Sequence, residues 1–229
     1  MRIIIFLGLM LSSFISFAFK GFVYEAGSQR KKVLYNIERI NKFEENKEYL
    51  AIKFAEPDGT PAVTEEAFFV NDKLMRYTVN YHRRNEQGEV LIKDGRIYFE
   101  YNKDGKKKKN DEKFVDNFIV GLSMSKFIEA NWDKLVAGKT LDVRFGVDYR
   151  LDTVGFSIFR QKDKEKEKNI MRVKMKPSSF LIAALVDPIY FNFDLNTKKM
   201  LSFSGRTKPK QKIKDKWKDL DGETVYIWE

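Results

Sequence analysis

The sequence predicts a mainly β protein of α+β class: a strongly curved antiparallel meander sheet, or half-barrel, packed around or lidded by two short helices. Apolar and polar residues alternate with a period of two through much of the chain. Tight-turn dipeptides fall between these runs, and two segments alone have helical spacing. A closed β-barrel with the helices outside remains an alternative.

The first eighteen residues have the layout of a secretory signal peptide. Arg2 is followed by the apolar run Ile3 to Leu11, and Ser16 and Ala18 supply the small residues of a cleavage site. Retention as a membrane anchor is the alternative, because Ile3 to Phe19 reaches the lower length limit for a membrane span. We therefore expect an exported, periplasmic protein with one domain over residues 19–229 and no transmembrane span after cleavage.

Alternating segments predict roughly ten short strands, each with one buried and one solvated face. Their apolar positions include Val33, Tyr35 and Ile37; Leu50, Ile52 and Phe54; Met75, Tyr77, Val79 and Tyr81; Ile97, Phe99 and Tyr101; Leu141, Val143, Phe145 and Val147; Val154, Phe156 and Ile158; Met171, Val173 and Met175; and Ile189, Phe191 and Phe193. Asn71-Asp72, Asp94-Gly95, Asp104-Gly105 and Asn196-Thr197 are predicted turns. Neighbouring strands should therefore pair as hairpins.

The first predicted helix spans residues 123–136. Its apolar residues recur at spacings of three and four, which places Met124, Phe127, Ile128, Trp132 and Leu135 on one face. Ser123 is suited to cap its start, and Gly138 is suited to the left-handed conformation just after its end.

The second predicted helix spans residues 178–186 and ends before Pro188, because a residue preceding proline is pushed out of helical geometry. A helix this short is unstable alone in water. We expect it to be held by burial of Phe180, Leu181, Ile182 and Leu185, each worth about 1.5–3 kcal/mol if fully buried.

The composition argues against several classes of site. The chain has no cysteine and one histidine, so we expect no disulfide, no metal site and no cofactor. His82 is expected to lie at the surface of a strand. Asp148 and Asp152 are a weak candidate for paired-carboxylate chemistry, and a turn interaction with Arg150 is favoured over it. We therefore expect a protein that is not an enzyme.

Three blocks carry a resemblance to a known family: "FIEANWDKLVAGKTLDVRF", "RLDTVGF" and "SSFLIAALVDPIYFNFDLNTKKMLSFSG". In order and spacing they are similar to an uncharacterised family of exported proteins from Gram-negative bacteria, over roughly residues 115–207. The predicted architecture also resembles, more distantly, the periplasmic lipoprotein carriers LolA and LolB, which bind acyl chains between a curved sheet and a helical lid. That likeness implies a curved sheet with an apolar cavity, but a fold alone does not determine function.

The function favoured by these observations is non-catalytic binding or carriage of a lipid or other hydrophobic ligand. The predicted cavity lining is Phe127, Trp132, Phe180, Leu181, Leu185, Phe191 and Phe203. The same side chains filling a solid core is the competing interpretation.

The net charge of +10, which becomes +9 when Arg2 is removed with the first eighteen residues, favours contact with anionic surfaces. The candidate contacts are Lys106, Lys107, Lys108, Lys109, Lys208, Lys210 and Lys212. Lipid, lipoprotein or an anionic envelope surface are the expected partners, and nucleic acid is not.

An envelope structural or interaction module that uses the basic surface or a sheet edge is the alternative function, and a periplasmic hydrolase is less favoured. The oligomeric state stays open.

Overall fold

The computed structural model describes residues 18–162, 169–184 and 186–228, so the predicted signal peptide lies outside these ranges except for Ala18. The first half of the chain forms β1 (Ala18–Glu25), β2 (Val33–Glu44), β3 (Lys47–Ala55), β4 (Pro61–Val70), β5 (Lys73–Tyr81), β6 (Glu86–Lys93), β7 (Arg96–Lys103) and β8 (Lys106–Lys113). The second half forms β9 (Phe118–Ile119), β10 (Leu141–Val147), β11 (Asp152–Arg160), β12 (Ile170–Pro177), β13 (Ile189–Asp194), β14 (Met200–Arg206), β15 (Gln211–Ile213), β16 (Lys216–Lys218) and β17 (Asp221–Trp228).

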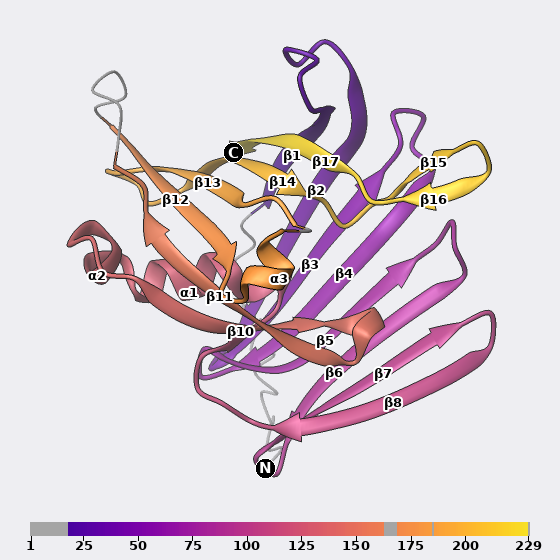
Figure 1. Cartoon of the computed structure of the whole chain (residues 1–229), viewed down its shortest axis with the longest axis horizontal. Coiled ribbons are helices and arrows are strands. Elements are labelled where there is room, and N and C mark those ends of the chain that lie inside the picture. Colours follow the sequence, from indigo (N-terminus) through magenta and orange to yellow (C-terminus); the bar gives the residue numbers. More distant parts are fainter. Residues whose placement is uncertain (1–17, 163–168, 185, 229) are drawn as a thin grey trace, which may run out of the picture.

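Fifteen of these strands form one curved sheet (Figure 1). Strands β1 to β8 run as one meander and β9 to β14 as a second, and β17 joins the two by pairing with both β1 and β14. Every pairing is antiparallel except that of β9 with β10. The predicted curved antiparallel meander is confirmed. The closed barrel is wrong, because the end strands β8 and β9 are not hydrogen-bonded to each other.

The sheet has more strands than the alternating pattern predicts. β8, with the sequence KKKKNDEK, has no apolar residue, yet its backbone pairs with β7 along its whole length. Backbone hydrogen bonding does not require an apolar side chain, so the two-residue period does not reveal such a strand. The predicted turns Asn71-Asp72, Asp94-Gly95 and Asp104-Gly105 all have positive φ at both residues, as type I′ hairpin turns require.

The helical segment after β9 is broken into shorter pieces: the 3₁₀ turn η1 (Gly121–Ser123), α1 (Met124–Ala130) and α2 (Trp132–Val136). The break falls at Asn131, whose side-chain amide donates to the carbonyl of Phe127 at 2.9 Å. Such bonds compete with regular helix geometry. The predicted apolar face is buried, and the Trp132 ring meets Phe193 of β13 edge-on at 5.9 Å.

The second predicted helix is shorter and less buried than expected. α3 (Phe180–Ala183) has four residues, and the Phe180 side chain is 87 % exposed. Ile182 packs against the core, and the Val186 N–H donates to its carbonyl at 3.0 Å. One helical turn separates these two residues, so they share a face, whereas Phe180 lies two residues from Ile182 and points elsewhere. Burial of Phe180 is therefore a wrong prediction. The side chain of Leu181 and all of Leu185 lie outside the described residues.

Side chains connect the two halves of the sheet where no strand ladder does. We call the contacts between β8 and the β10–β11 turn the seam: Asn110 Nδ2 donates to the Leu151 carbonyl at 3.0 Å, and Glu112 accepts from Thr153 N–H at 3.0 Å and Thr153 Oγ1 at 2.7 Å. The turn itself contains the 3₁₀ segment η2 (Asp148–Arg150). The seam brings η2 over β6 and β7.

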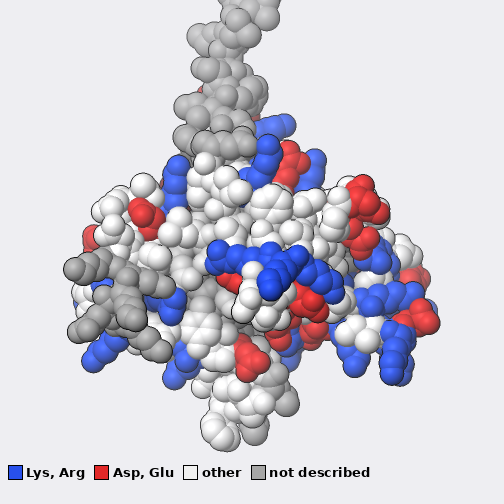
Figure 2. Space-filling view, turned by 90° about the horizontal axis from the view of Figure 1, so that it is seen from above, with Lys and Arg blue, Asp and Glu red and all other residues white. Residues whose placement is uncertain are grey.

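Charged side chains of both signs lie beside one another over the face shown in Figure 2. Oppositely charged side chains also form ion pairs on the sheet, such as Lys107 and Lys109 with Glu100 at 2.9 and 2.7 Å. Within the described ranges, the helices are all too short or too polar to traverse a bilayer.

We expect Glu112→Ala to lower the free energy of unfolding by about 1–2 kcal/mol, because two hydrogen bonds to a half-exposed carboxylate are lost. Urea denaturation of the variant and the wild type measures the difference. Lys113→Ala on the same strand is the control and should change stability little. Equal stabilities for Glu112→Ala and wild type would show that the seam does not hold the sheet.

Candidate functional site

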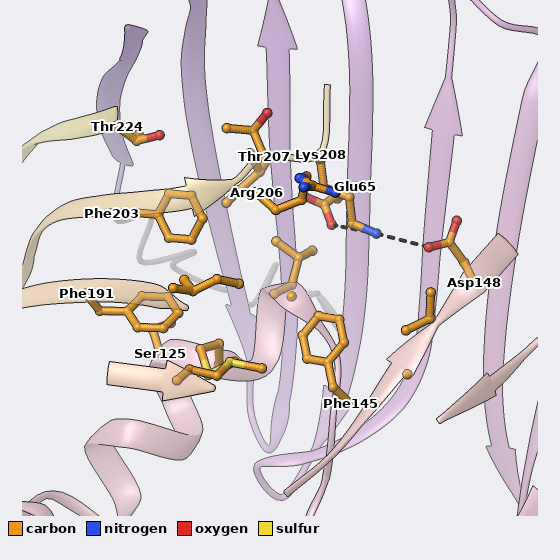
Figure 3. A pocket seen from close by; sticks show the side chains of 18 of the residues that line it. Glu65, Ser125, Phe145, Asp148, Phe191, Phe203, Arg206, Thr207, Lys208 and Thr224 are labelled. Carbon is orange, nitrogen blue, oxygen red and sulfur yellow. Dashed lines mark hydrogen bonds and ion pairs between the residues drawn. The ribbon is translucent and has the colours of Figure 1, made fainter. Parts of the chain in front are cut away.

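A cavity of about 340 Å³ lies inside the curved sheet, at the junction of its two halves (Figure 3). Most of its wall is apolar. The wall residues from the first half are Phe19, Leu50, Ile52 and Phe54, those from the second half are Phe145, Val154, Phe156, Met175, Phe191 and Phe203, and those from the helical segment are Leu122, Met124 and Ser125. The interior is therefore not a completely filled core.

The segment that includes α3 closes part of the cavity. Ile182, Val186 and Ile189 all line it, and they come from α3, the turn after it and the start of β13. The four residues of α3 are too few to be stable without such contacts. This segment is therefore a short cover that places Ile182, Val186 and Ile189 against the cavity.

Glu65, Tyr81, Asp148 and Lys208 form a polar part of the wall, and Tyr77 lies behind them; we call these five residues the Lys208 cluster. Lys208 Nζ lies 3.1 Å from Asp148 Oδ1 and 3.9 Å from Glu65 Oε1 (Figure 3). The Tyr81 hydroxyl donates to Asp148 Oδ2 at 2.9 Å, and the Tyr77 hydroxyl donates to Glu65 Oε1 at 2.5 Å. Both carboxylates are thus paired and hydrogen-bonded, as buried charges must be.

Three separate parts of the chain build this cluster. Glu65 lies on the inward face of β4, and Tyr77 and Tyr81 lie on the inward face of β5. Asp148 comes from η2, and Lys208 comes from the segment between β14 and β17, residues 207–220, which we call the arm. The arm is also held by the Tyr35 hydroxyl, which donates to the Lys210 carbonyl at 3.1 Å.

Gly88 allows η2 to reach the cluster. It occupies an inward-facing position of β6, where a Cβ atom would lie 2.7 Å from Cβ of Asp148. Any side chain at this position would displace Asp148. The glycine within this strand therefore marks a close approach of another segment.

Burial and charge act in opposite directions in the Lys208 cluster. Burial raises the pKa of Glu65, Asp148 adds to the rise, and Lys208 and the Tyr77 hydroxyl oppose it. For Lys208 the neighbouring anionic groups, Asp148 first, outweigh the burial and hold its pKa well above the usual value. Burial also raises the pKa of both tyrosines. Lys208 is therefore charged at neutral pH, and the tyrosine hydroxyls remain protonated donors.

The predicted lining residues divide into three groups. Phe191 and Phe203 line the cavity, with their rings 5.5 Å apart. Phe127 and Trp132 pack in the same hydrophobic cluster as these two rings but do not line the cavity, and Phe180 faces solvent. Helical spacing identifies which residues share an inward face, but not whether that face meets packed side chains or open space.

The predicted anion-contact lysines also differ in their surroundings. Lys106 to Lys109 are exposed on β8, and two of them pair with Glu100. Lys210 pairs with Asp219 at 2.8 Å and Lys212 with Asp215 at 3.1 Å. The side chain of Lys208 is only 23 % exposed, so it is less open to a surface contact than Lys106 to Lys109. Its sequence context is basic, but the arm folds back over the cavity and brings it to Asp148.

The remaining titratable candidates are not brought together. Asp152 pairs with Arg150 at 3.1 Å, as the turn interpretation predicts, while Asp148 is buried beside Lys208. His82 Nε2 lies 2.9 Å from Thr64 Oγ1 in an exposed position. In the described parts of the chain, no three acidic or histidine side chains are grouped so that they could hold a metal ion.

Two charged residues at inward positions of the sheet are not among the predicted site residues. Arg39 continues the alternation of Tyr35 and Ile37 along β2, and Glu65 lies between Val63 and Ala67 on β4. A charged residue in the apolar register of a strand is the signal that would have found them, because burying it demands a partner.

We expect Lys208→Met to lower the free energy of unfolding by about 3 kcal/mol, because Asp148 is then left charged and buried without its partner. The double variant Lys208→Met, Asp148→Asn should recover most of this loss. Thermal and urea denaturation of the two variants measure this loss of stability and its recovery. Equal losses in the single and double variants would contradict a coupled pair.

The raised pKa of Glu65 predicts a pH-dependent effect of Glu65→Gln. As pH rises above the usual glutamate pKa of 4.5, the unfolded chain ionises more readily than the folded protein, so Glu65 costs stability that glutamine does not. The stability of the variant relative to wild type should therefore increase from pH 4 to pH 7.

Glu100→Gln is the control of opposite sign, because Lys109 and Lys107 lower the pKa of Glu100 to about 2. Its stability relative to wild type should fall between pH 2 and pH 5. Urea denaturation measures the stability of Glu65→Gln from pH 4 to pH 7 and that of Glu100→Gln from pH 2 to pH 5. A flat profile for Glu65→Gln would show that burial does not raise the pKa of Glu65.

No protein-family model matches this chain, and no curated protein matches it. Among solved structures, the chain is similar to a β-barrel-like protein of the domain of unknown function DUF1849 from Brucella abortus. The two share 13 % sequence identity, the match covers 93 % of this chain and 95 % of that chain, and the TM-score is 0.40. The function is therefore argued from the cavity.

Proposed function

We propose that this protein is a non-catalytic binding or carrier protein for a lipid or other hydrophobic ligand, which it takes into the cavity. The proposal includes export to the periplasm with removal of residues 1–18. The observation that supports it is the cavity of about 340 Å³ with mainly apolar walls. This volume lies within the range of small-molecule sites, roughly 300–1,000 Å³.

The distribution of wall residues favours an elongated apolar ligand. Phe145, Ile189 and Phe203 are only partly buried and face the cavity from different strands. Transfer of apolar surface from water is favourable by roughly 25 cal/mol per Å². A ligand that covered these side chains would therefore gain affinity along its length, without any need for specific hydrogen bonds.

The segment around α3 is the proposed entrance. Ile182 and Val186 contact the cavity, while Phe180 beside them is exposed. Movement of this short segment would expose the wall at the cost of a few apolar contacts. Pro177 and Pro188 flank it and restrict the backbone on either side.

A second candidate function is strand addition by a partner protein at the edge of the sheet. β8 is an end strand and its side chains are largely exposed, which favours such a contact. The lysines along β8 oppose it, because charged side chains on an edge strand discourage pairing with a further strand. A cavity without measurable ligand binding, together with a partner protein whose binding requires β8, would favour this candidate over the first.

We expect wild-type protein to bind the neutral dye N-phenyl-1-naphthylamine, with an increase in dye fluorescence, and Ser125→Phe to weaken this binding about tenfold or abolish it, because the added ring occupies the cavity. Ser125 lies in α1 and lines the cavity. The added ring therefore enters open space, and the substitution should not lower the melting temperature. Fluorescence titration measures the affinity.

Ala130→Phe is the matched control: it places the same ring on the exposed side of α1 and should leave dye binding unchanged. Dye binding that is absent from the wild type, or equal in Ser125→Phe and wild type, would contradict the proposed use of the cavity.

A further inference from the structure

Arg39 is a cation in the wall of an apolar cavity. It lies on the inward face of β2, between the buried residues Ile37 and Asn41, and it lines the cavity. Its guanidinium carbon lies 5.4 Å from the centre of the Phe19 ring. Arginine is rare in an inward register unless its charge is compensated.

The protein satisfies only part of the hydrogen-bonding capacity of Arg39. Its Nε atom donates to Asn41 Oδ1 at 2.8 Å, and the two terminal nitrogens have no acceptor among the described residues. Those nitrogens carry four of the five N–H groups of a guanidinium. They are therefore available to a group that enters the cavity.

The carboxylate that Arg39 reaches through Asn41 is that of Glu48, and it already has an ion-pair partner. Asn41 Nδ2 donates to Glu48 Oε1 at 3.1 Å, and Lys126 Nζ lies 2.5 Å from Glu48 Oε2. Asn41 thus separates Arg39 from Glu48, and Lys126 already neutralises that carboxylate. Glu129 also acts electrostatically on Arg39, but neither it nor Glu48 forms an ion pair with the guanidinium.

The other cations that line the cavity are all paired. Lys208 is bound to Asp148, Arg206 to Asp219 and Asp221, Lys210 to Asp219, and Arg150 to Asp152. Among the described residues of the cavity wall, Arg39 alone has no carboxylate within ion-pair distance. Within this described wall, a negatively charged ligand group would therefore meet a cation without a direct ion pair only at Arg39.

Two hydroxyl groups of β17 line the same cavity. Thr224 and Tyr226 both belong to its wall, and neither hydroxyl is hydrogen-bonded to a described residue. The ring of Tyr226 lies edge-on to Phe19 at 4.9 Å. Gly21 of β1 lets this ring lean across the strand toward β2, because a Cβ atom there would lie 3.2 Å from it.

The electrostatic surroundings agree with this picture. Burial lowers the pKa of Arg39, because a charged group loses hydration inside the sheet, and Glu48, Glu129 and Tyr226 oppose this only in part. The positive charge of Arg39 in turn lowers the pKa of Tyr226, against the larger rise that burial causes. A bound anion would offset the cost of burying the guanidinium.

We propose that the ligand is an amphipathic molecule with an acidic head, a carboxylate or a phosphate ester, that binds Arg39 with help from Thr224 and Tyr226 while its apolar chain fills the cavity. This inference rests on the proposed function and names its ligand class. A guanidinium matches both acidic groups through paired, charge-assisted hydrogen bonds.

The test compares ligands of one chain length on the wild-type protein. Dodecanoic acid and dodecyl phosphate should displace N-phenyl-1-naphthylamine at concentrations about tenfold or more below that of dodecan-1-ol, as expected when hydrogen bonds to a charged group are gained. Inorganic phosphate alone should not displace the dye. The order of the two acidic ligands tells which head group the site prefers.

Arg39→Gln should remove the preference, so that the acids and the alcohol displace the dye at similar concentrations. Arg39→Lys should restore part of it, because it keeps the charge and loses the planar fork. Lys42→Gln is the matched control, since it removes an exposed cation from the outward face of the same strand and should keep the preference. Melting temperatures check that each variant is folded.

The outcomes separate the two proposals. Equal displacement by acid and alcohol on the wild-type protein, or a preference that survives Arg39→Gln, would overturn the acidic-head inference and leave the hydrophobic cavity as a binding site. A wild-type protein that binds neither the dye nor any of the dodecyl compounds would overturn both. If Arg39→Gln does not fold, the wild-type comparison and Arg39→Lys still decide the question.

Discussion

The ion pair of Lys208 with Asp148 is the contact on which the arrangement of the interior depends. It joins the arm, the η2 turn and, through Glu65 and Tyr81, the inward faces of β4 and β5. Taking two charges out of water is costly, and it is tolerated only where geometry and additional hydrogen bonds compensate. The cluster meets this condition, and so it fixes the position of two segments that are otherwise held by few apolar contacts.

The cavity follows from the size and curvature of the sheet. A sheet of fifteen strands that curves around its own interior encloses more space than its side chains can fill, since the width of such structures grows with strand number. The helices, η2 and the arm occupy much of that space, and the cavity is what remains. The side-chain seam between β8 and the β10–β11 turn holds the two ends of the sheet together where their backbones do not pair.

Two polar regions of different character face this cavity. The Lys208 cluster contains its own carboxylates, so its role is internal and structural. Arg39 with Thr224 and Tyr226 has donors and no carboxylate. In surroundings of low dielectric this difference matters, because a charge without a direct ion pair gains most from a partner that comes from outside. In the proposed function, the apolar walls bind the chain of the ligand and Arg39 orients its acidic head.

The sequence by itself determined the local structure: the alternating strands, the type I′ turns and the apolar face of α1 and α2 are all present. These features depend on neighbouring residues, through side-chain period and backbone preference. Only the tertiary structure decided that Phe180 is exposed while Ile182 packs inward, that Phe203 faces a cavity while Trp132 fills a core, and that Lys208 pairs with Asp148. Each of these depends on which distant segment lies opposite a side chain, and the sixty residues of chain between Asp148 and Lys208 carry no local signal of that contact.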